Sequence, residues 1–100
     1  MWNALGKILT VALIAGAATA VIYLSMDAIR NWMMNNIRHD SKQLVVVKEA
    51  LANGNYGLIA GVINYDDEVT ASNTWQNVAM DEELEAIFHG EDTATIIIQH

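Results

Sequence analysis

Cysteine and proline are both absent from this 100-residue chain, and only five of its residues are basic. Without cysteine there is no disulfide framework and no thiolate zinc site, and the redox compartment stays undetermined. The net charge of -7 argues against a nucleic-acid binder, because neutralising phosphates requires a basic face. The apolar content of 53% excludes intrinsic disorder, and the length is too small for a large enzyme.

The charges divide unevenly between the two halves of the chain. Residues 1–48 carry all five basic residues and two acidic ones, which gives +3, whereas residues 49–100 carry ten acidic residues and no Lys or Arg, which gives -10. An asymmetry of this kind bears on the choice of partners and not on the fold.

The longest uncharged stretch covers residues 8–26. As a helix it would be about 28 Å long, close to the roughly 30 Å hydrocarbon core of a bilayer. Trp2 and Trp32 each lie six residues beyond it, near the level that indole rings favour. We therefore predict a short tail over residues 1–7 and a transmembrane helix over residues 8–26. A buried core helix and a cleaved secretory signal are the alternatives.

The basic residues that flank this stretch predict its orientation. Lys7 precedes it, and Arg30, Arg38 and Lys42 follow it. The positive-inside rule then places the C-terminal domain in the cytoplasm, with the N-terminus outside. The predicted membrane-interface residues are Trp2, Lys7, Arg30, Trp32 and Arg38.

Small residues repeat every four positions within the predicted span, at Ala12, Gly16 and Ala20. They would form one ridge on a helix, where a second membrane helix could approach closely. The expected partners are therefore the lipid bilayer and other membrane-protein chains, like or unlike. A ridge that simply faces lipid is the alternative.

Residues 27–53 contain no Gly or Pro, and their apolar residues follow a loose helical spacing. We expect a juxtamembrane helix here, either continuous or restarted at Ser41, carrying the basic residues that follow the span. The run from 44 to 47, Leu-Val-Val-Val, also fits a short strand. Good helix formers at 48–52 and the Asn53-Gly54 stop favour the helix.

Residues 54–100 predict a small acidic α+β domain. Residues 56–64 would present apolar residues on both faces of a strand, which is typical of a central buried strand. After a turn at 65–68, residues 69–78 alternate like a strand with one wet face. Asp81 is placed to cap a short helix, and residues 93–99 form the last strand.

The order of these elements is ββαβ. A hairpin makes the first two strands antiparallel, and a crossover helix returns the third strand parallel to the second. The predicted fold is therefore α+β, with a single N-terminal transmembrane helix and a three-stranded antiparallel sheet of order 2-1-3.

No catalytic motif is present in the sequence. His89, Glu91 and Asp92 are close enough in sequence to bind a metal weakly, but a solvated helix end is the favoured interpretation. Residues 39–41, His-Asp-Ser, are adjacent letters and not a converging triad, and the acidic residues at 66–68 fit a solvated turn. We predict no catalytic, cofactor-binding or metal-binding residue.

The remaining candidate site is a group of acidic side chains at the start of the predicted helix. Its members are Asp81, Glu82, Glu83 and Glu85. They are interpreted as a docking face for a basic partner, with a role in solubility as the alternative.

These features favour a non-enzymatic single-pass membrane protein, an accessory or structural subunit of a membrane-bound assembly. A self-assembling coat or filament subunit and a membrane-tethered regulator or inhibitor are the alternatives. No nucleic acid, small-molecule substrate or cofactor is expected.

Overall fold

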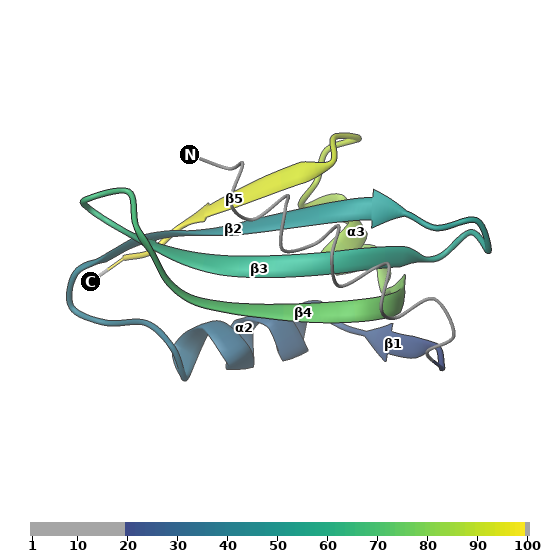
Figure 1. Cartoon of the computed structure of the whole chain (residues 1–100), viewed down its shortest axis with the longest axis horizontal. Coiled ribbons are helices and arrows are strands. Elements are labelled where there is room, and N and C mark those ends of the chain that lie inside the picture. The colour runs from purple at the N-terminus through teal and green to yellow at the C-terminus, as the bar shows by residue number, and fades with distance from the viewer. Residues whose placement is uncertain (1–19, 100) are drawn as a thin grey trace.

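A computed structural model of the chain describes residues 20–99. These residues form a mixed α+β fold in which a five-stranded curled sheet carries two helices (Figure 1). The elements are β1 (Ile22–Leu24), α2 (Met26–Met34), β2 (Ser41–Ala50), β3 (Tyr56–Asn64), β4 (Val69–Met80), α3 (Glu82–Ala86) and β5 (Thr93–Ile97). The strand order across the sheet is β1-β4-β3-β2-β5, with β1 parallel to β4 and every other pair antiparallel.

The predicted transmembrane helix is wrong, and so are the membrane localisation and the orientation that followed from it. Its last residues form β1 and the start of α2, and among residues 20–99 no helix is long and apolar enough to cross a membrane. The break has a local cause: β-branched and aromatic residues favour a strand at 22–24, and Ser25 then caps α2 by accepting from the Ala28 N–H at 3.2 Å. Residues 1–19 lie outside the described part of the chain.

The long helix expected after the span is also wrong. α2 ends at Met34, and the Asn36 side-chain amide donates to the Trp32 carbonyl at 2.7 Å in the last turn. Residues 41–50 are the strand β2, which pairs with β3 on one side and β5 on the other. Pairing on both edges buries Val45 and Val46 completely, and this gain outweighs the helix propensity of residues 48–52.

The sheet has five strands, so the predicted three-stranded sheet is wrong. The β3–β4 hairpin is antiparallel, as expected, and β3 has the predicted bounds. However, β2 lies between β3 and β5, so β5 pairs with β2 and runs opposite to the predicted direction. An inserted strand reverses the direction of the next strand in an antiparallel ladder.

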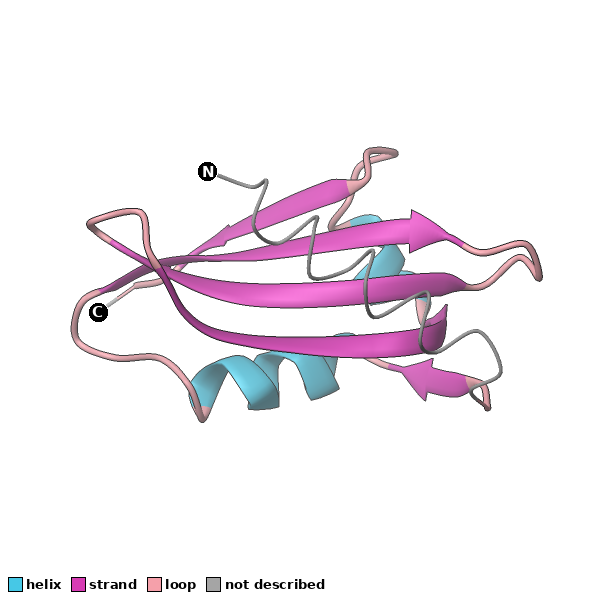
Figure 2. Cartoon of the chain, in the orientation of Figure 1, coloured by secondary structure: helices cyan, strands magenta, loops and turns pink. Residues whose placement is uncertain are grey.

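Both helices cover the same face of the sheet, drawn behind the strands in Figure 2. We call it the helix face, and it holds the larger core cluster, with Ile29, Leu44, Leu58 and Phe88 almost fully buried. The opposite face of the sheet holds a second cluster. Its members are Val45, Ile59 and Ile63, with the half-buried Val47 and Val69 packed against them.

The turn between β3 and β4 is held by one buried amide. The Asn64 Oδ1 accepts from the N–H groups of Asp66 and Glu68, at 3.0 and 2.8 Å. Asp67 has a φ of 62°, a left-handed conformation that Asp tolerates better than most residues. Its carboxylate pairs with the Lys42 ammonium at 2.7 Å. The acidic residues at 66–68 therefore have a turn-forming role.

Candidate functional site: the cleft beside strand β5

An apolar cavity of about 250 Å³ lies on the helix face, between α2 and the outer part of the sheet. It is lined by Met26, Ile29, Arg30, Met33, Leu44, Ile87 and Ile96. Six of these seven side chains are apolar, and α2, β2, β5 and the segment after α3 all contribute. A cavity of this size and composition suits one apolar side chain or a small apolar molecule.

Arg30 provides the only charge among the residues that line this cavity. Its Nη1 donates to Asp27 in the same helix at 2.9 Å and contacts Glu83 of α3 at 2.7 Å. The hydrogen bond to Glu83, and then the one to Asp27, raises the pKa of Arg30 above its ordinary value. The guanidinium therefore joins the two helices beside the cavity while remaining exposed to solvent.

Strand β5 forms one outer edge of the sheet and borders this cavity through Ile96. The Lys48 N–H donates to the Asp92 carbonyl and the Ile98 N–H to the Lys42 carbonyl, so even-numbered residues of β5 pair with β2. Backbone groups alternate along a strand, so Thr93, Thr95 and Ile97 direct theirs away from β2. No described strand pairs with that outer edge.

The outer edge of β5 lacks the charged residues and the proline that often protect an edge strand. No charged residue occurs between Thr93 and Gln99, and the chain has no proline. The side chain of Ile97 is 61% exposed. Uncharged, β-branched edges of this kind are templates for pairing with another extended chain. The cleft therefore combines an open backbone ladder with an adjacent apolar cavity.

The opposite edge of the sheet, at β1, is a weaker candidate. A second cavity of about 370 Å³ lies there, and Tyr23 is 86% exposed beside it. However, β1 has only three residues, too few to offer a backbone ladder of useful length.

The acidic residues predicted as a docking face have divided roles. Asp81 caps α3, where its Oδ1 accepts from the Leu84 N–H at 2.8 Å, and its Oδ2 accepts from the Met26 N–H at 3.4 Å. Glu83 is paired with Arg30, whereas Glu82 and Glu85 are exposed. Asp81 and Glu83 therefore make contacts within the fold, and docking through the group as a whole stays a prediction.

The residues predicted at a membrane interface have other contacts in the structure. Trp32 of α2 packs edge-on against Trp75 of β4, with ring centroids 6.2 Å apart and the planes at 82°. Arg38 pairs with Asp40 at 3.3 Å. Trp2 and Lys7 lie outside the described residues.

The small-residue ridge falls almost entirely outside the described part of the chain. Ala12 and Gly16 precede it, and Ala20 is an exposed residue ahead of β1. The structure therefore does not place the predicted ridge on a helix.

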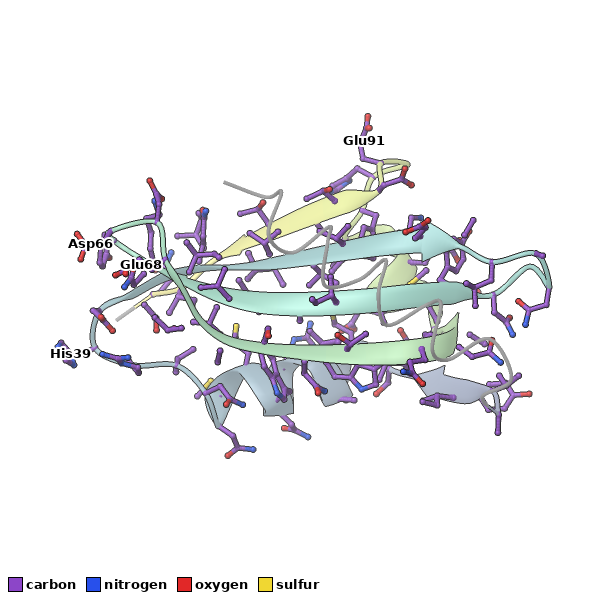
Figure 3. The ribbon with its side chains drawn as sticks, viewed as in Figure 1. His39, Asp66, Glu68 and Glu91 are labelled. Atoms are coloured by element: carbon purple, nitrogen blue, oxygen red, sulfur yellow. The ribbon has the colours of Figure 1, made fainter. Side chains whose placement is uncertain are left out.

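The titratable side chains weighed as metal or catalytic groups are dispersed. Figure 3 shows His39, Asp66 and Glu68 at one end of the sheet and Glu91 near the other. Within residues 20–99, no group of three or more His, Cys, Asp or Glu side chains is arranged to hold a metal ion.

No protein-family model, curated protein or solved structure matches this chain. The β5 cleft was not among the sites predicted from sequence. The usable signal was the charge-free stretch from Thr93 to Gln99, which indicates a strand without edge protection. The cavity had no local signal, because its lining comes from four separate segments.

Proposed function

We propose that this protein is a non-enzymatic binding protein that captures an extended segment of a partner protein along strand β5. The observation that carries this proposal is the open, uncharged edge of β5 beside an apolar cavity. Addition of a strand to a sheet edge supplies affinity through main-chain hydrogen bonds, and a side-chain pocket supplies specificity.

The geometry defines the chemistry of the partner segment. Its backbone pairs with the outward groups of Thr93, Thr95 and Ile97, so it is extended and has no proline at the paired positions. One apolar side chain on its helix-face side enters the cavity beside Ile96. The net charge of -7 favours partners with basic residues around this segment, because opposite charge accelerates association.

The test uses peptides selected from a displayed library of random 12-residue sequences, with affinity measured by calorimetry. Thr95→Pro removes an outward N–H that β2 does not use, so the fold tolerates it while the added strand loses a hydrogen bond. We expect at least a tenfold loss of peptide affinity. Thr95→Val is the matched control, because it keeps the N–H and the β-branched shape, and its affinity stays unchanged.

A second matched pair tests the cavity. Ile96→Phe directs extra volume toward the cavity, whereas Ile97→Phe places the same volume on the opposite face of the same strand. We expect only Ile96→Phe to weaken binding of peptides with a large apolar anchor. Failure to select any peptide, or equal binding by Thr95→Pro and Thr95→Val, contradicts the proposal. Concentration-dependent self-association that Thr95→Pro abolishes would identify a second copy as the partner instead.

A further inference from the structure

The centre of the sheet face opposite the helices is buried, although neither described helix covers it. Val45, Ile59 and Ile63 are each 0% exposed, and they form a cluster separate from the helix-face core. Both α2 and α3 contribute to the helix-face cluster. The cover of the opposite face therefore comes from outside the helices that the structure describes.

The opposite face has an apolar centre and a polar border. Gly57 and Gly61 of β3 are buried and alternate with Ile59 and Ile63. Because glycine has no side chain, the middle of the face is shallow as well as apolar. The cross-strand register gives this centre a mostly polar border of Gln43, Ser72, Thr74, Thr93 and Thr95, and the apolar residues on the same face are Val47, Val69 and Ile97. A low apolar centre with polar surroundings suits a narrow apolar segment that lies across the strands.

We propose that residues 1–19 of the same chain form this cover. Residues 8–19 contain no charged residue, so they match the chemistry of the face. The described chain starts at Ala20, directly ahead of β1 at the sheet edge beside β4, so residues 1–19 join the described chain at the edge of the sheet.

The length of the segment fits the width of the sheet. Five strands span roughly 19 Å between the outer strand axes, at about 4.8 Å per strand spacing. Nineteen residues reach about 28 Å even as a helix and further when extended, so the segment crosses the whole sheet in either form. A second copy of the chain would have to insert an equally apolar surface, and on residues 20–99 the large exposed apolar side chains are the three consecutive residues Val21, Ile22 and Tyr23 and single residues elsewhere.

The test compares two adjacent valines in the full-length chain. Val45 and Val46 are both 0% exposed and lie on opposite faces of β2. Because the native chain has no cysteine, Val45→Cys and Val46→Cys each give a single thiol for measuring a labelling rate. In the otherwise unchanged chain we expect both thiols to be protected.

The cover is then disturbed with Leu13→Asp/Ile14→Asp. In an extended segment one of the two side chains points to the sheet, and in either conformation two new charges make burial of this part of the segment on an apolar face unfavourable. We expect labelling at position 45 to accelerate at least tenfold, while position 46 stays protected. The charge-matched control Asn31→Asp/Ala52→Asp changes two exposed residues outside the proposed cover, in α2 and in the turn after β2, and leaves both rates unchanged. Rapid labelling at position 45 without any disturbance, or no acceleration in the disturbed chain, overturns the proposal.

A second measurement needs no substitution, so it stands even where the disturbed chain fails to fold. Methyl groups in residues 8–19 should show nuclear Overhauser effects to Ile59 and Ile63 in the native chain. Mixing labelled with unlabelled chains separates contacts within one chain from contacts between two. Absence of these contacts, or their appearance only between chains, overturns the proposal. Neither result bears on the β5 cleft, so this inference and the proposed function fail independently.

Discussion

The two faces of the sheet have equally buried centres but are organised by different interactions. On the helix face, directional contacts accompany the apolar core: Asp81 bonds to the start of both helices, and Lys48 lies 4.9 and 4.8 Å from the ring centres of Tyr56 and Phe88. On the opposite face, the cluster of Val45, Ile59 and Ile63 contains no polar member. Directional contacts fix the position of a packed element, whereas apolar contact alone stabilises any cover of suitable shape.

This difference explains why the helix face yields a defined site. Bonds from Asp81 and the Arg30–Glu83 pair hold α2 and α3 in place, and the cavity remains between them and β5. At the centre of the opposite face, the described cluster of Val45, Ile59 and Ile63 offers apolar area only. Each prediction below tests how far the two faces differ, from the largest expected effect to the smallest.

Truncating one core residue on each face tests whether both centres are dry. Leu58 and Ile59 are adjacent in β3, are both 0% exposed, and belong to different clusters. We expect Leu58→Ala and Ile59→Ala each to lower the free energy of unfolding by about 3 kcal/mol, as measured by urea denaturation. Ser72→Ala, at an exposed position, should change it by less than about 0.5 kcal/mol. If Ile59→Ala lowered the free energy of unfolding by less than about 1 kcal/mol while Leu58→Ala had its full effect, water would reach the centre of the opposite face.

Removing the cap of α3 tests the directional contacts of the helix face. Asp81→Ala leaves the Leu84 and Met26 N–H groups without their carboxylate acceptor. We expect a loss of about 1–2 kcal/mol in the free energy of unfolding, typical of N-cap removal. Glu82→Ala is the matched control one residue away, and its smaller effect would separate capping from charge. Equal effects of the two substitutions would contradict a structural role for Asp81.

Removing the cation of Lys48 tests a weaker contact of the same face. Lys48→Met keeps the apolar stem over Tyr56 and Phe88 but loses the attraction of the ammonium to the rings. We expect a loss of about 0.5–1 kcal/mol in thermal or urea unfolding. Glu49→Gln, on the other side of the same strand, should have no measurable effect. A stabilising Lys48→Met would show that burying the stem matters more than the cation.

The smallest effect is expected at the exposed ion pair between the helices. The side chains of Arg30 and Glu83 are 50% and 56% exposed, so water and salt screen their attraction. Arg30→Gln should therefore change stability less than the Leu58, Ile59, Asp81 and Lys48 substitutions above, and the difference from the native chain should vanish in 1 M NaCl. A salt-independent loss would instead indicate that the Arg30 stem stabilises the cavity wall by packing.

The sequence predicted correctly those elements that depend on neighbouring residues. The predictions failed where contacts between residues far apart in the chain determine the structure. Strand β3, its hairpin with β4 and the Asp81 cap follow from alternation and capping within a few residues. The uncharged run over 8–26 has the length of a membrane span, and this length led to the wrong prediction. Ser25 at its end and Asp27 just after it are typical of the start of a new helix, and α2 does start there. The β5 cleft was missed because its cavity joins four segments.

The sequence by itself determined the alternation of apolar and polar residues, the helix cap at Asp81 and the distribution of charge. Alternation and capping depend only on residues within one helical turn or a few strand positions. Only the tertiary structure decided that residues 41–50 form β2, because their strand state is stabilised by pairing with β3 and β5 at both edges. The same insertion reversed β5 and placed its unprotected edge beside the cavity. Trp32 likewise packs on Trp75, 43 residues away, since long-range contacts and not local spacing set which apolar surfaces meet.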